Sequence, residues 1–143
     1  MYPFTIIRKD SIFPVSKNFK ENEFYTKCED YQSRYHLFDV RLIAAVQACR
    51  DFVHSAVYIT STFRTPKCNA SQGGAKNSWH LKGMAVDFYC PECHQKIVDQ
   101  LISKGPLFRA LRKSGVKGFG ISDKFIHLDT RPMPGKTFEL WYY

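Results

Sequence analysis

Three segments of the chain carry apolar residues at helical spacing. The clearest is residues 36–54, where the apolar positions are Leu42, Ala45, Val46, Cys49, Phe52 and Val53. Residues 94–104 repeat the spacing, and Gly105-Pro106 would end that helix. A shorter helix is predicted over residues 107–113, before Gly115.

Other segments follow the pattern of strands and loops. Residues 56–63 and 84–89 are rich in β-branched and aromatic residues, which favours strands. The runs 117–122 and 124–130 predict a hairpin, and the aromatic chain end is expected to pack back on the domain. We expect residues 64–78 to form a long ordered loop and residues 1–35 to form a wrapping segment with little regular structure.

Polar residues interrupt two of the predicted strands on one face only. Asp87 lies on the opposite face from its strand neighbours, and His127 shares its own face with Asp129. The apolar positions left for the core are Val86, Phe88, Ile126 and Leu128. If the two strands are neighbours, Asp87 and His127 can share one ion, and His80 could supply a third ligand from the preceding loop. Two histidines and one carboxylate form a catalytic type of zinc set, although each residue alone is also typical of a loop histidine or a salt-bridged carboxylate.

Helices combined with a mainly antiparallel sheet predict the α+β class. The 143 residues suit one domain, spanning 1–143, with a core over residues 36–131. A hydrophobic content of 44% is enough to bury that core.

The chain is basic, with 21 Lys and Arg against 13 Asp and Glu, a net charge of +8. This charge favours polyanionic partners such as nucleic acid, anionic lipid or the polymers of a bacterial wall. The basic residues are scattered, which argues against a nucleic-acid tail. No apolar run is long enough to predict membrane insertion, and the first residues lack the apolar core of a signal peptide. We therefore expect synthesis in the cytoplasm, with any exit by a route that the sequence does not encode.

The cysteines offer a second candidate for metal chemistry. Residues 90–94 spell C-P-E-C-H, the string used for covalent haem attachment. Haem would also need export, and a structural zinc would need a fourth ligand beyond Cys90, Cys93 and His94. A redox pair is a further alternative. Because five cysteines are an odd number, we expect a reduced protein in which Cys90 and Cys93 are free thiols before the next helix.

The polar residues around these strands resemble a known family. The elements are an Arg64-Thr65-Pro66 turn, Asn69, Gly73-Gly74, the run S-x-H-x-x-G-x-A-x-D over residues 78–87, and H-x-D over residues 127–129. This arrangement is similar to the M15 zinc peptidases of bacterial cell walls, which include D-alanyl-D-alanine carboxypeptidases, murein endopeptidases and phage endolysins. The match covers roughly residues 56–131. It implies the α+β fold shared by D-Ala-D-Ala peptidases and hedgehog domains.

The resemblance also implies roles for individual residues. His80, Asp87 and His127 would be the zinc ligands. Arg64 would hold a substrate carboxylate or a developing oxyanion, because a guanidinium stays charged and donates in a planar fork. Ser78 would hydrogen-bond the substrate or a ligand.

The general base departs from the pattern of many family members. Lys124 occupies the position, three residues before His127, where those members carry an acid. Asp129 and Asp123 are the alternative catalytic candidates. Asp129 could equally orient His127, and Asp123 could equally form the turn.

The resemblance implies a zinc-dependent peptidase of peptidoglycan stem peptides or cross-links, either carboxypeptidase or endopeptidase, acting as a monomer. The missing signal peptide suits a phage lysis protein that reaches the wall or periplasm after release. Lys124 keeps open a non-catalytic module that binds wall peptide or a partner protein. A nucleic-acid-binding domain would leave the pattern of His80, Asp87 and His127 unexplained.

Overall fold

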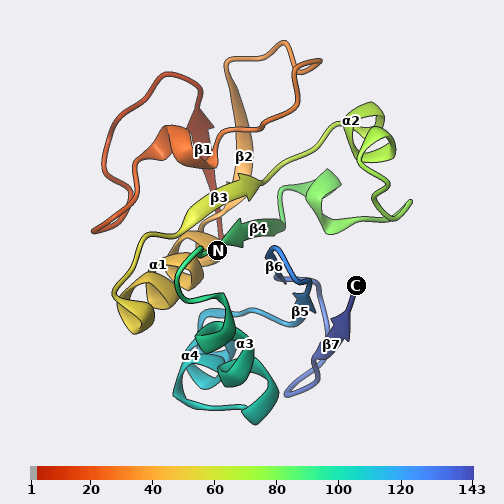
Figure 1. Ribbon diagram of the computed structural model, residues 1–143. Coiled ribbons are helices and arrows are strands. Elements are labelled where there is room, and N and C mark those ends of the chain that lie inside the picture. The colour runs from red at the N-terminus through yellow and green to blue at the C-terminus, as the bar shows by residue number, and fades with distance from the viewer. Residues whose placement is uncertain (1–2) are drawn as a thin grey trace.

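The computed structural model describes residues 3–143 and has the expected α+β class (Figure 1). Its helices are α1 (Val40–Val53), α2 (Pro66–Ser71), α3 (His94–Ser103) and α4 (Pro106–Ser114), with short 3₁₀ turns η1 (Glu21–Phe24) and η2 (Trp79–Lys82). Its strands are β1 (Phe4–Arg8), β2 (Tyr35–Asp39), β3 (Tyr58–Ser61), β4 (Ala85–Tyr89), β5 (Gly118–Ile121), β6 (Ile126–Asp129) and β7 (Glu139–Tyr142). Within the described residues, no helix combines the length and apolar character needed to cross a membrane.

The main sheet has five strands in the order β3-β4-β6-β5-β7. Neighbours are antiparallel except β5 and β7, which run parallel, so the prediction of a mainly antiparallel sheet is confirmed. The predicted hairpin is β5 and β6, and the aromatic chain end packs back as β7. A second sheet pairs β1 with β2.

One face of the main sheet is apolar and is covered by helices. Figure 1 shows α1, α3 and α4 gathered on one side of the strands, away from α2. The buried faces of these helices pack against every second residue of the strands, as the sequence predicts for β4 and β6. This core includes Val86, Phe88, Phe119, Ile126 and Leu128. The other face of the same strands is left to polar residues.

Three predicted segments differ from the structure in detail. The predicted helix over 36–54 begins at Val40, because residues 35–39 pair with β1 and Asp39 caps the helix through Arg41 N at 3.0 Å. The predicted loop 64–78 contains α2, which Thr65 caps at Cys68 N and in which Pro66 takes the first turn. The predicted irregular segment 1–35 contains β1 and η1.

The expectation of a reduced protein with free thiols at Cys90 and Cys93 is wrong. Cys28 is bonded to Cys68, and Cys90 to Cys93, leaving Cys49 as the buried free thiol of the described chain. An odd count permits this arrangement because one thiol lies in the core. A turn after β4, with Cys93 N donating to Cys90 O at 3.3 Å, brings the second pair together. Because the sulfurs of Cys90 and Cys93 are bonded to each other, they are not free to bind haem or a structural zinc at C-P-E-C-H.

We expect loss of the Cys28–Cys68 bond to destabilise the protein by about 4 kcal/mol, because the bond closes a loop across a sequence separation of 40 residues. Urea unfolding of Cys28→Ser, Cys68→Ser and the double variant measures this. All three should lose the same amount, since each breaks the same bond. Additive losses in the double variant would contradict the bond.

Acid should weaken the fold through His36. This side chain is buried, its Nε2 accepts from Thr26 N at 3.0 Å, and its Nδ1–H donates to Leu37 O at 3.1 Å. Burial lowers the pKa of His36 below its ordinary value of 6.5. As the pH falls below 6.5, His36 becomes protonated in the unfolded chain while it stays neutral in the folded chain. The free energy of unfolding therefore falls as the pH falls. Urea unfolding between pH 7 and pH 5 should show a shallower loss in His36→Gln than in wild type, and identical slopes would refute this role.

Candidate metal centre

The polar face of the sheet carries a row of directly paired residues. Asp87 on β4 lies opposite His127 on β6, and His127 lies opposite Gly120 on β5. The row continues to Ser61 on β3 and to Trp141 on β7. Paired residues of neighbouring strands project to the same face, so the predicted sharing between Asp87 and His127 follows directly from the register.

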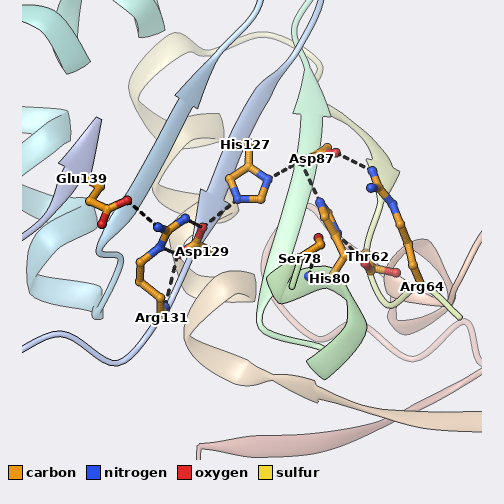
Figure 2. A network of polar contacts seen from close by, with 9 residues as sticks. All are labelled: Thr62, Arg64, Ser78, His80, Asp87, His127, Asp129, Arg131 and Glu139. Carbon is orange, nitrogen blue, oxygen red and sulfur yellow. Dashed lines mark hydrogen bonds and ion pairs between the residues drawn. The ribbon is translucent and has the colours of Figure 1, made fainter. Parts of the chain in front are cut away.

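Three candidate ligands converge on this row. His127 Nδ1 lies 2.8 Å from Asp87 Oδ1, and His80 Nε2 lies 3.1 Å from the same oxygen. One ligand atom from each residue falls within 4.8 Å of the other two, and all three side chains are buried. Figure 2 shows both imidazoles directed at the carboxylate, His127 from one side and His80 from below. The three residues expected to bind zinc are therefore brought together.

His80 reaches the carboxylate from the 3₁₀ turn η2 that precedes β4. Ser78 caps this turn by accepting from His80 N at 3.2 Å, and Gly83 ends it with a left-handed φ of 68°. A side chain at position 83 would meet Leu37 O at 2.5 Å. The glycine therefore lets η2 lie close against β2, which fixes the position of His80.

The outer nitrogen of each imidazole has an acceptor of its own. His80 Nδ1–H donates to Thr62 O at 2.6 Å, and His127 Nε2–H donates to Asp129 Oδ2 at 2.8 Å. Each ring therefore turns its other nitrogen toward Asp87. Metal-binding histidines almost always have such a partner behind them, which sets the tautomer and the ring orientation. The donor set thus fits a metal ion with nitrogen and oxygen ligands, such as zinc.

Asp129 is held from behind by an ion-pair network that reaches β7 (Figure 2). Arg131 donates to both of its oxygens, at 2.8 and 2.7 Å, and also to Glu139 at 2.6 Å. Burial alone would raise the pKa of Asp129, but hydrogen bonds from Arg131 and His127 outweigh it and lower the pKa to about 2. Asp129 is therefore ionised, fully buried and turned toward His127.

Arg64 follows β3 and approaches Asp87 from the β3 side of the sheet. It donates to Asp87 Oδ2 at 3.0 Å, to Ser61 Oγ at 2.8 Å and to Asn69 Oδ1 at 3.2 Å. Burial alone would raise the pKa of Asp87, but its contacts with the His127 and His80 imidazoles hold it below its usual range. Burial lowers the pKa of His80. The pKa of His127 is raised because its bonds to Asp129 and Asp87 outweigh its burial.

The centre opens on a cleft of about 700 Å³. Arg64 and Ser78 line it beside His80, Asp87 and His127, as expected for residues that meet a substrate. One wall is the polar loop over residues 72–78, followed by Trp79 of η2, and the other carries Phe125, Arg131, Trp141 and Tyr143. Trp141 and Tyr143 were not singled out from the sequence, where the aromatic chain end signalled packing alone.

Two sequence candidates lie away from the cleft lining. Asp123 is exposed in the turn between β5 and β6, beside the exposed Lys124. Asp129 is buried beneath His127. Among the described residues that line the cleft, Asp87 alone carries a carboxylate. Cys28, Asp30 and Cys68 also lie within ligand distance of one another, but their sulfurs are joined in the disulfide.

A buried set of two histidines and one carboxylate, anchored from behind and open to a cleft, is typical of catalytic metal sites. Comparison with known families points to an enzyme: the family model for peptidase M15 matches residues 17–129. The chain belongs to the peptidase M15 family, which confirms the resemblance read from its motifs.

The chain is also similar to a curated protein, the probable peptidoglycan L,D-endopeptidase MepK of Haemophilus influenzae. The two are 33% identical over 85 residues, which cover 56% of this chain and 42% of that protein. The chain thus matches less than half the length of this relative.

Gly118 on β5 should prove essential to the position of Asp129. A Cβ at position 118 would lie 2.3 Å from both Asp129 carboxylate oxygens. We expect Gly118→Ala to cost about 1–3 kcal/mol of unfolding free energy, as overpacking does. In an Asp129→Ala background the same methyl should cost far less, and urea unfolding of the four proteins measures the coupling. Equal costs in both backgrounds would show that the carboxylate is not the obstacle.

Proposed function

We propose that this protein is a zinc-dependent peptidase that hydrolyses a peptide bond of bacterial peptidoglycan. The observation that carries the proposal is the convergence of His80, Asp87 and His127 within 4.8 Å at the base of an open cleft. Membership of the peptidase M15 family supports hydrolysis of peptide bonds. The name of the relative, a probable peptidoglycan endopeptidase, supports the substrate class and favours an endopeptidase.

His80 Nε2, His127 Nδ1 and one oxygen of Asp87 would hold the zinc ion. Zinc would supply a Lewis acid that polarises the scissile carbonyl and lowers the pKa of a water molecule to about 7. Thr62 and Asp129 hold the two imidazoles in the orientation that this role requires. The Asp87 carboxylate contacts both imidazoles and forms an ion pair with the Arg64 guanidinium.

Arg64 and Ser78 line the cleft and are our candidates for contact with the substrate. The Arg64 guanidinium lines the cleft while its bonds to Ser61 and Asn69 fix its plane. We assign it the role of binding a substrate carboxylate or the developing oxyanion. Ser78 lines the cleft from the loop that precedes η2, and we assign it a hydrogen bond to the peptide.

Asp129 fits a positioning role better than that of a base in contact with substrate. It is fully buried, and its oxygens already accept from Arg131 and His127. Asp123 is exposed and outside the cleft lining, which is consistent with a turn-forming residue. We therefore assign Asp129 to orienting His127 and strengthening it as a ligand.

Action at the cell wall is part of the proposal. Disulfides persist in oxidising compartments, and the structure has two of them. A net charge of +8 would favour residence on an anionic wall. A phage-encoded lysis protein acting as a monomer, released to the wall after synthesis in the cytoplasm, is one setting that joins these features.

A second candidate function is a module that binds wall peptide without cutting it. The observation in its favour is the cleft lining, in which Asp87 is the sole carboxylate among the described residues. Such a module would bind zinc and peptide but release nothing from purified walls. Turnover therefore separates the two candidates.

Metal analysis tests the centre. We expect one zinc per chain in wild type, none in His127→Ala, and one in the matched surface control Asp123→Ala. Asp129→Asn should weaken zinc affinity by about 10- to 100-fold, because it alters the hydrogen bond behind His127. Zinc retained by His127→Ala would place the metal elsewhere.

Release of peptides from purified murein sacculi tests the activity. We expect wild type to release new amino groups, a chelator to stop the release and added zinc to restore it. His127→Ala should be inactive while its circular dichroism spectrum is unchanged. Release that persists in the chelator would exclude the metal mechanism, and no release from any wall type would favour the binding module.

A further inference from the structure

The strand β7 lies beyond residues 17–129, which match the family, yet its Trp141 and the following Tyr143 line the cleft. We propose that Trp141 and Tyr143 form an aromatic subsite that binds the aliphatic side chain of the substrate residue next to the scissile bond. This inference rests on the proposed peptidase function and adds the part of the substrate that the cleft recognises.

The register of the sheet places Trp141 in the same row as the metal centre. Asp87, His127, Gly120 and Trp141 are paired in succession across β4, β6, β5 and β7. Gly120 has no side chain, so the indole extends across β5 toward His127, with their ring centroids 5.4 Å apart. A ligand on this part of the indole therefore lies next to a proposed zinc ligand.

Gly120 is required for this arrangement. A Cβ at position 120 would lie 2.9 Å from two carbons of the Trp141 indole and from one carbon of the Tyr143 ring. Both rings thus occupy the space above this glycine. The pairing of β5 with β7 directs them onto the site face rather than into the apolar core on the opposite face.

The rings are held in place while part of their surface stays open. The Arg131 guanidinium lies 4.9 Å from the centre of the Trp141 ring, and Tyr143 packs on Phe125 at 5.1 Å. Tyr143 is 68% exposed, although it lines the cleft. An exposed aromatic surface fixed by its neighbours offers apolar contact area at little cost in side-chain entropy.

The two walls of the cleft differ in chemistry, and this difference defines the ligand. The loop over residues 72–78 presents Lys76, Asn77 and Ser78, which suit carboxylates and peptide groups. The β7 wall presents flat rings, which suit methyl and methylene groups. A peptide whose backbone and carboxylates face the loop would place an aliphatic side chain on Trp141. The location beside His127 assigns that side chain to a residue flanking the bond that is cut.

Steady-state kinetics on two probes tests the subsite: a stem tetrapeptide, and the same peptide linked to its disaccharide. We expect Trp141→Ala to raise KM for both probes by up to about tenfold, the effect of losing one aromatic contact. The value of kcat and the zinc content should stay close to wild type. Trp141→Phe should recover most of the affinity. The matched control is Tyr142→Ala, which removes an exposed β7 aromatic outside the cleft lining and should change neither constant.

An unchanged KM in Trp141→Ala, or a fall in kcat accompanied by zinc loss, would overturn the subsite while leaving the peptidase function intact. A KM effect confined to the disaccharide-linked probe would also overturn it, since the rings would then bind sugar. If wild type cuts neither probe, its activity on purified murein sacculi decides whether the proposed peptidase function stands, and calorimetric Kd values for the tetrapeptide replace KM. Weaker binding by Trp141→Ala then supports the subsite, and equal binding or none overturns it.

Discussion

The antiparallel pairing of β4 with β6 is the constraint on which the site depends. It sets Asp87 directly opposite His127 and turns Val86, Phe88, Ile126 and Leu128 toward the helices. A shift of one residue in this register would send the histidine or the carboxylate into the core. The same apolar contacts that stabilise the fold therefore hold the two proposed ligands together on the opposite face.

The strand β5 lies between β6 and the edge strand β7 and therefore links the β4–β6 pair to β7. Its site face carries Gly118 and Gly120, and the space above them is filled by the Asp129 carboxylate and by the Trp141 and Tyr143 rings. The chain of ion pairs from Glu139 through Arg131 and Asp129 to His127 depends on the first glycine. The wall of the cleft depends on the second. β7 thus contributes both to the support of a proposed ligand, His127, and to the shape of the cleft.

Much of this arrangement could be predicted from local patterns. Alternation along two short strands identified Asp87 and His127, and the helical spacing of α3 and α4 gave segments within a residue of those observed. Partners that meet only after folding could not be predicted. The pairing of Cys28 with Cys68 joins the wrapping segment to α2, and no local pattern relates the two cysteines. β2 was assigned to a helix because its contacts with β1 lie more than 25 residues back along the chain. The role of Trp141 likewise depends on a parallel pairing across a long connection.

We propose that two imidazoles and one carboxylate, and no cysteine, hold a zinc ion at the base of the cleft. X-ray absorption at the zinc edge of the purified protein tests it directly, because sulfur and the lighter ligands differ in distance and scattering strength. We expect a first shell of nitrogen and oxygen at about 2.0–2.2 Å, with the outer-shell signature of imidazole. A sulfur shell at about 2.3 Å would instead place the metal on cysteine residues and exclude the site at His80, Asp87 and His127.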